Sequence, residues 1–180
     1  MDAHPCAGGW RAAFSSSNKR SWAVSFLVIN YMAKQSKEKY ILSMTGEYGV
    51  CSELSKRGLN VSITLGNMKA VDVMVFMEDK TCRRIEVKTS RNTRFVTGFF
   101  QKYYDKNLKD HPDFWILVHI IPSNDVVEKE KLVYYILTHE EMGEEQRKRN
   151  KMNDWYHVKG CDNVLLKNIE QFKGRWEKIK

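Results

Sequence analysis

Residues 70–90 constrain the fold more strongly than any other part of this 180-residue chain. Valine occupies every second position from 71 to 75, and the alternation resumes at Ile85 and Val87 after a polar stretch. A period of two is typical of β-strands that bury one face. We therefore predict an antiparallel hairpin centred near Asp79, in which the residue numbers of opposed pairs sum to about 158–160.

Three charged residues interrupt these apolar strands. The predicted register places Asp72 opposite Glu86 or Lys88, and side-chain alternation puts the glutamate and the lysine on one face. Two carboxylates about 5 Å apart repel each other by roughly 3 kcal/mol at an effective dielectric constant near 20. A divalent cation between them would reverse the sign of that interaction, so the pattern indicates a metal site. An ordinary salt bridge on a solvated sheet face would use the same residues and remains the alternative.

A predicted helix upstream of the hairpin carries a further acid. Apolar residues at helical spacing predict a helix from about Lys39 to Gly58, and Glu47 lies at the border of its apolar stripe. The glutamate is therefore a candidate for the same site, and a charge near the helix start that complements the helix dipole is the alternative. Gly46 and Gly49 beside it would permit close approach by another backbone.

The remaining pattern predicts further strands and helices around the hairpin. A continuous apolar run at 113–121 is typical of a strand that is buried on both faces. Thr138 and Glu141 have the spacing of a capping box, which begins a helix. The other predicted elements are strands at 59–65 and 131–137, irregular chain or a short closing strand at 155–166, and an amphipathic helix at 168–179. Together they indicate one α/β domain with a mixed sheet of four or five strands flanked by helices.

Residues 1–31 differ from the rest of the chain. They contain loop-like stretches and an apolar run at 22–31 that is too short to span a bilayer. We predict that they form an N-terminal extension, which either lies outside the natural protein, with Met32 as its start, or is loosely packed. Residues 32–180 then form the single folded domain, and no interaction with a membrane is expected.

Composition narrows the classes of partner and compartment. The formal net charge is +8 and the pI is about 9.3, a balance that suits a polyanion such as nucleic acid. The four cysteines are widely scattered and form no C-x-x-C pair, which argues against a zinc site and against a disulfide scaffold. A reducing, cytoplasmic location is therefore expected.

The charged residues of the hairpin have a distinctive spacing. Asp72 is followed by thirteen residues and then by the triplet Glu86-Val87-Lys88. This spacing resembles the core motif of the PD-(D/E)XK nuclease superfamily, with Val71 in the place of the proline. The string at 85–90 is similar in particular to that of small, mostly bacterial, uncharacterised members of the superfamily.

The resemblance implies a restriction-endonuclease-like mixed β-sheet flanked by α-helices, and a metal-dependent hydrolysis of phosphodiester bonds with DNA as the expected substrate. Asp72 and Glu86 would bind Mg²⁺ or Mn²⁺, with the Val87 carbonyl as a third ligand. Glu47 matches the upstream helical glutamate of the superfamily and would act through water or on a second metal. Lys88 would orient and activate the attacking water and offset the charge that develops on the phosphate.

Basic residues follow the motif in the sequence. Arg91, Arg94 and Lys102 would contact backbone phosphates, which is a sequence-independent form of binding. Aromatic residues alternate with basic ones at 95–108, and they would either stack on nucleobases or pack into the core. Two other functions stay open: a non-catalytic nucleic-acid-binding or assembly module on the same fold, and a metal-free hydrolase that uses the carboxylate pair on sugars. The sequence also leaves a homodimer open.

Overall fold

The computed structural model describes residues 16–64, 71–99, 111–125, 127–150 and 162–180, with side chains from Tyr31 onward except that of Asn150. The chain divides into two compact units, Met1–Lys39 and Tyr40–Lys180. Helix α1 (Ser16–Lys56) has residues in both units, and the other described elements belong to the second. Among the described helices, none is long and apolar enough to cross a membrane.

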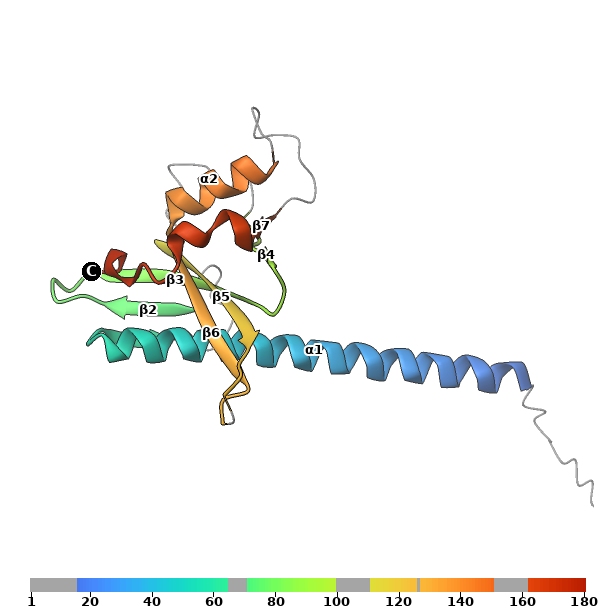
Figure 1. The fold of residues 1–180 in the computed structure, drawn as a ribbon. Helices are drawn as coiled ribbons and strands as arrows, with labels where there is room; N and C mark the ends of the chain where they lie inside the picture. Colours follow the sequence, from blue (N-terminus) through green and yellow to red (C-terminus); the bar gives the residue numbers. More distant parts are fainter. Residues whose placement is uncertain (1–15, 65–70, 100–110, 126, 151–161) are drawn as a thin grey trace, which may run out of the picture. The chain divides into compact units, whose positions relative to one another are not determined.

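A mixed five-stranded sheet forms the centre of the second unit (Figure 1). In spatial order its strands are β1 (Asn60–Ile63), β2 (Val73–Phe76), β3 (Cys82–Ser90), β5 (Phe114–Pro122) and β6 (Glu130–Thr138). Neighbouring strands are antiparallel except β3 and β5, which are parallel and therefore need a crossover connection. That connection includes β4 (Arg94–Val96), which pairs with β7 (Asn163–Leu165) in a separate two-stranded sheet.

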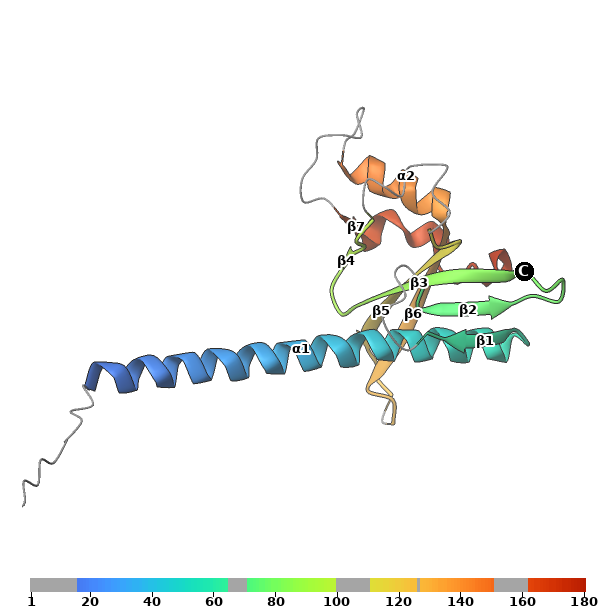
Figure 2. The same ribbon diagram turned by 180° about the vertical axis from the view of Figure 1, so that it is seen from behind.

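The sheet is buried on both faces because its strands alternate apolar side chains to each side. The α1-side core contains Val50, Leu54, Val73, Val75, Ile85, Val87, Phe114, Ile116, Val118, Ile136, Trp176 and Ile179. The α2-side core contains Phe95, Phe99, Trp115, Leu117, Tyr135, Leu137, Met142, Val164, Ile169 and Phe172. The second half of α1 and helix α2 (His139–Asn150) lie on opposite faces of the sheet (Figures 1 and 2). The prediction of an α/β domain with a mixed sheet is confirmed at this level.

The predicted hairpin between β2 and β3 is confirmed. Val73 pairs with Ile85, a register in which opposed residue numbers sum to 158. Lys80 has a positive φ of 67° in the turn. The side chain of Asp79 accepts a hydrogen bond of 2.9 Å from the Thr81 amide, so the turn is centred where the sequence predicts.

The other predicted strands and the capping box are also present, with shifted ends. The Thr138 amide donates to Glu141 Oε2 at 2.8 Å, and the Glu141 amide donates to Thr138 Oγ1 at 3.2 Å. This reciprocal pair begins α2 as predicted. Strands β1 and β7 lie within the ranges predicted from the sequence. Strand β5 is shifted by one residue toward the C-terminus, and β6 is one residue longer at each end than predicted. Residues 155–161 lie outside the described part of the chain.

The helix that carries Glu47 is longer than predicted, since α1 begins at Ser16 and not near Lys39. Residues 16–45 contain no glycine or proline, so the sequence offers no helix breaker in this stretch. The predicted helix start is therefore wrong. Residues 1–15 lie outside the described part of the chain, and the assignment of 1–31 as an extension stays a prediction.

The predicted amphipathic helix at the end of the chain is wrong. The segment forms three short 3₁₀ helices, which are η2 (Leu166–Asn168), η3 (Glu170–Phe172) and η4 (Trp176–Lys178). Gly174, at φ 66°, turns the chain between the last two. As a result, Ile169 and Phe172 pack in the α2-side core, whereas Trp176 and Ile179 pack in the α1-side core.

Candidate functional site

Asp72 lies just before β2 and is joined to β3 by two hydrogen bonds. Its backbone N–H donates to the Ile85 carbonyl at 2.9 Å, and its Oδ2 accepts a bond of 2.7 Å from the Val87 backbone N–H. The two bonds flank Glu86, so Asp72 lies beside Glu86 at the end of the hairpin, as the predicted register requires. Because both backbone groups of a strand residue point to the same neighbouring strand, the Val87 carbonyl also faces the Asp72 side.

Glu86 and Lys88 form an ion pair on β3. Lys88 Nζ is within hydrogen-bond distance of Glu86 Oε1, which confirms that the two side chains share a face. Glu86 Oε2 is buried and has no hydrogen-bond partner among the described residues. The exposed fraction is 30% for the Lys88 side chain and 11% for the Glu86 side chain, so water reaches the ammonium more readily than the carboxylate. The salt bridge of the alternative interpretation is therefore present, but its acid is buried and not on a solvated face.

Glu47 approaches these residues from α1 and is buried. Its Oε1 accepts a hydrogen bond of 2.9 Å from the hydroxyl of Ser43, one turn earlier. Its charge is repelled by Asp72 and attracted by Lys88, and Glu86 is repelled by both other acids. The structure therefore brings the four predicted side chains within electrostatic range. Glu47 is far from the start of α1, so its alternative role as a partner of the N-terminal helix dipole is wrong.

The pKa is raised for all three carboxyl groups of the site. Burial is the largest cause for Glu47, Asp72 and Glu86, and repulsion between the acids raises the pKa of Glu47 and Glu86 further. The Val87 amide and the Lys88 ammonium act in the opposite direction on the pKa of Asp72. The charged forms are therefore disfavoured on balance, and a bound cation or proton would relieve the site.

The donor atoms of the site fit a hard divalent cation. Carboxylate and carbonyl oxygens are the ligands that Mg²⁺ prefers, and Glu86 Oε2 has no competing partner among the described residues. Within the described ranges, no three His, Cys, Asp or Glu side chains converge closely enough to hold a metal ion by themselves. Mg²⁺ in proteins usually keeps several waters and binds one or two carboxylates, so Asp72, Glu86 and the Val87 carbonyl fit such a partial set.

The three basic residues predicted to contact phosphates differ in their surroundings. Arg91 forms an exposed two-pronged ion pair with Glu130, with 3.0 Å from Nε to Oε1 and 3.1 Å from Nη2 to Oε2. A phosphate would have to displace Glu130 to bind there. Arg94 begins β4 with an exposed side chain. Lys102 lies outside the described residues.

Two contacts at the site were not predicted from the sequence. Ser43 lies four residues before Glu47, a helical spacing that could have identified it. Thr89 packs against Gly46, where a Cβ on the glycine would come within 1.9 Å of Thr89 Oγ1. Close approach at Gly46 and Gly49 is confirmed, but the approaching groups are side chains and not the predicted backbone.

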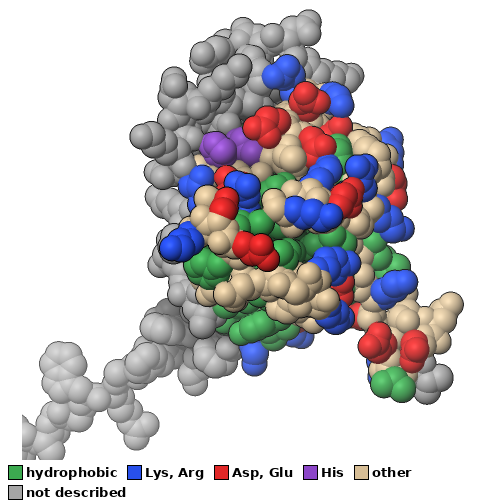
Figure 3. Space-filling model, turned by 90° about the vertical axis from the view of Figure 1, so that its left-hand side faces the viewer, with side chains coloured by type: hydrophobic (Ala, Val, Ile, Leu, Met, Phe, Trp, Pro, Cys, Tyr) green, Lys and Arg blue, Asp and Glu red, His purple; other side chains and the backbone are tan. Residues whose placement is uncertain are grey.

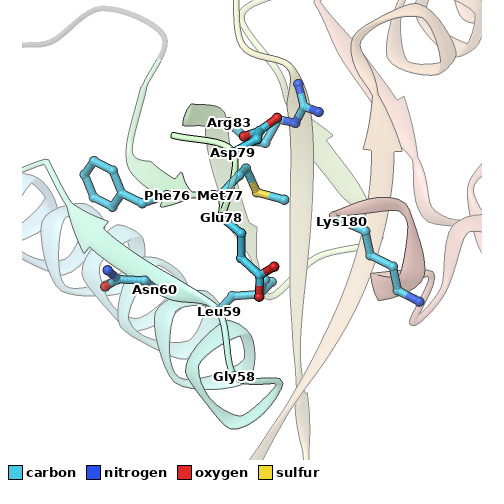
Figure 4. Close-up of a pocket in the computed structure, with 9 residues that line it drawn as sticks. All are labelled: Gly58, Leu59, Asn60, Phe76, Met77, Glu78, Asp79, Arg83 and Lys180. Carbon is cyan, nitrogen blue, oxygen red and sulfur yellow. The ribbon is translucent and has the colours of Figure 1, made fainter. Parts of the chain in front are cut away.

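Two open pockets in the described part of the structure are not lined by Glu47, Asp72 or Glu86. One of about 620 Å³ lies at the turn of the β2–β3 hairpin, where side chains of both charge signs, such as Glu78 and Lys180, line it (Figure 4). Another of about 210 Å³ is lined by His111 and His139, whose rings stack with centroids 4.1 Å apart. On the face drawn in Figure 3, acidic and basic side chains are mixed and not separated by sign. These pockets do not contain the predicted site residues.

No family model matches this chain, and it has no match among curated proteins or solved structures. The function must therefore be inferred from the geometry of Glu47, Asp72, Glu86 and Lys88. Such a site is characterised by what its groups can bind and by the reaction that they can assist.

Proposed function

We propose that this protein is a metal-dependent nuclease of the restriction-endonuclease-like type, which hydrolyses phosphodiester bonds with DNA as the expected substrate. The proposal rests above all on one observation: half-buried Asp72 lies beside buried Glu86, which has one oxygen without a partner among the described residues and the ammonium of Lys88 next to it. Buried acids destabilise a fold unless they are paired or bind a metal. A divalent cation matches both the charge and the oxygen donors of this pair.

Each residue of the site has a proposed role. Asp72 and Glu86 would hold Mg²⁺ or Mn²⁺ together with the Val87 carbonyl, and Glu47 would act through water or at a second ion. The ion supplies Lewis-acid stabilisation of the phosphate and lowers the pKa of a bound water. Lys88 has three N–H donors and no acceptor, so it would donate to the attacking water and to phosphate oxygens. That contact strengthens as negative charge develops in the transition state.

The charge of the protein supports a polyanionic substrate. The net charge of +8 favours association with nucleic acid of any sequence. Arg94 is exposed and would contact a backbone phosphate. Arg91 would exchange Glu130 for a phosphate, which requires little energy because both side chains of that ion pair are exposed and screened by water.

The second candidate is a non-catalytic nucleic-acid-binding or assembly module on the same fold. The observation that favours it is the lack, in the described part of the chain, of three ligating side chains that converge on one point. The ion pair between Lys88 and Glu86 would then only neutralise a buried acid. Binding without cleavage is the result that this candidate requires.

A cleavage assay separates the two candidates. Plasmid DNA with Mg²⁺ or Mn²⁺ should be nicked or degraded, and EDTA should stop the reaction. Glu86→Gln should abolish cleavage, whereas Glu78→Gln, on the exposed turn of the same hairpin, should cleave like the wild type. If a panel of single- and double-stranded DNA and RNA were bound but never cut, the non-catalytic module would be the correct assignment.

A further inference from the structure

Helix α1 approaches β3 very closely one residue before Glu47. A Cβ placed on Gly46 would lie 1.9 Å from Thr89 Oγ1, 3.1 Å from its Cβ and 3.2 Å from its Cγ2. Contacts below 3.0 Å do not occur without a shift of the neighbouring atoms. With α1, β3 and the Thr89 side chain where they are, any side chain at position 46 would clash with Thr89 Oγ1.

Thr89 lies on the face of β3 that is turned toward α1. Ile85 and Val87 belong to the α1-side core, and side-chain alternation gives Thr89 the same face. Its Oγ1 is buried and makes no hydrogen bond to any described residue. The hydroxyl therefore packs against Gly46 and does not serve as a polar link, although an unpaired buried hydroxyl lowers stability.

We infer that Gly46 and Thr89 form a positioning contact that fixes how closely Glu47 approaches Asp72 and Glu86. The inference depends on the proposed function, because it assumes that the three acids work together. Gly46 is the neighbour of Glu47 on α1, and Thr89 follows the charged triplet on β3, so the contact sets the spacing of the two elements at their site-bearing residues. Threonine is stiff at χ1, and both of its γ atoms lie near Gly46. Rotation about χ1 can move Oγ1 away from Gly46 only by turning Cγ2 or Hβ toward it, and the Thr89 Cβ would stay 3.1 Å from the added methyl in either case.

The direct test is Gly46→Ala. The added methyl requires the elements to separate by at least about 1 Å before the contact reaches 3.0 Å. A misplacement of about 1 Å at a catalytic site can lower a rate by about 10²-fold. We expect the single-turnover cleavage rate to fall by about that factor. The increase in melting temperature on adding Mg²⁺ should also shrink, measured against the metal-free melting temperature of the same variant.

Two double variants test whether the effect is steric. Gly46→Ala with Thr89→Ala removes both γ atoms and leaves the tight but tolerable Cβ contact of 3.1 Å, so cleavage and the Mg²⁺ response should recover. Gly46→Ala with Thr89→Val puts a methyl group where the hydroxyl was, so neither should recover. If both double variants recovered equally, the steric contact would not be the cause.

Gly49→Ala is the matched control on the same helix. A Cβ there would lie 2.6 Å from Leu132 Cδ1 and 2.8 Å from the Tyr134 hydroxyl oxygen, which are ends of side chains on β6 and not on β3. Gly49→Ala should lower the melting temperature without reducing the Mg²⁺ response. If both glycine variants lost only thermal stability, Gly46 would be a packing residue and the inference would fail.

A further cycle tests whether Gly46 acts through Glu47. In a Glu47→Gln background, Gly46→Ala should reduce cleavage little further, because the group that it misplaces is already gone. If Gly46→Ala lowered the cleavage rate in this background by the same factor as in the wild type, the inference would be contradicted. Measurements on the wild type distinguish failure of the proposed function from failure of the positioning contact. If the wild type neither cleaves DNA nor responds to metal, the proposed function fails. If it does both and folded Gly46→Ala matches it, only the positioning contact fails.

Discussion

The two ends of the β2–β3 hairpin carry aspartates in opposite electrostatic situations. Asp79, at the turn, is exposed and accepts hydrogen bonds from the Thr81 hydroxyl at 2.6 Å and from the Thr81 amide at 2.9 Å. These bonds lower its pKa. Asp72, at the other end, has a raised pKa because burial outweighs the hydrogen bond from the Val87 amide. One carboxylate stabilises its own turn, and the other holds an unfavourable charge beside a second acid.

This difference gives a physical criterion for a functional acid. The bonds of Asp79 go to its own turn, so its charge is satisfied locally and it needs no ligand. At the other end, Glu86 keeps a buried oxygen without a partner among the described residues. Variants at the two ends of the hairpin should therefore differ in activity, metal response and pH dependence.

The largest effect is expected for Lys88→Ala. The ammonium would act mainly in the transition state, so its loss should lower the cleavage rate by about 10²–10³, which corresponds to about 3–4 kcal/mol. The Mg²⁺-induced increase in melting temperature should remain, because an ammonium cannot ligate a cation. Asp79→Asn, at the turn, should cleave at the wild-type rate. If Lys88→Ala cleaved as fast as the wild type, the Glu86-Val87-Lys88 triplet would be an ordinary strand segment.

The second effect concerns stabilisation by metal. Mg²⁺ at about 100 times its dissociation constant should stabilise the wild type by about 2.7 kcal/mol, and a domain of this size then melts about 5–10 °C higher. Asp72→Asn should largely abolish this increase in a thermal melt, whereas Asp79→Asn should retain it. An equal increase in both variants would place the ion elsewhere.

The third effect is a difference in pH dependence without metal. Folding raises the pKa of Asp72 and Glu86. Their protonated forms therefore stabilise the fold fully below the ordinary carboxyl pKa near 4, and this contribution is lost as the pH rises through the raised pKa values. Asp79 has a lowered pKa, so its contribution is present above about pH 4 and is lost on acidification. In melts with EDTA, Glu86→Gln should therefore flatten the loss of stability above pH 4. Asp79→Asn should flatten the loss of stability below pH 4. Parallel pH profiles for the two variants would contradict the opposite pKa shifts of Glu86 and Asp79.

The smallest effect is expected at Arg94, which lies outside the hairpin. Arg94→Ala should weaken DNA binding and reduce the slope of log K against log salt by about 1, because one phosphate contact is lost. Single-turnover cleavage at saturating protein should stay near the wild-type rate. A rate loss as large as that of Lys88→Ala would mean that Arg94 contacts the reacting phosphate.

The hairpin and its charged residues could be predicted because local rules determine them. A period of two assigns the faces, and a tight turn fixes the register that pairs Val73 with Ile85. The same rules placed Glu86 and Lys88 side by side. Glu47 could be assigned to a helix face, but its burial depends on how α1 docks on the sheet.

The structure differs from the sequence-based predictions where contacts between distant parts of the chain decide the outcome. The apolar spacing of Ile169, Phe172, Trp176 and Ile179 fits a helix, yet the turn at Gly174 directs the two halves into different cores. The pairing of Arg91 with Glu130 joins residues 39 positions apart, so the sequence near Arg91 does not reveal it.

The hairpin also has a consequence for the order of folding. The contact between Asp72 and Val87 spans 15 residues, whereas the bond from the Arg84 amide to Asp113 beside the parallel β3–β5 pair spans 29. Hairpins form in about 1–10 μs, and parallel pairing across a crossover is slower. We therefore expect the acidic pair to come together while it is still hydrated and to lose its water only when the sheet closes. A cation that relieves the finished site should for this reason slow unfolding more than it accelerates folding.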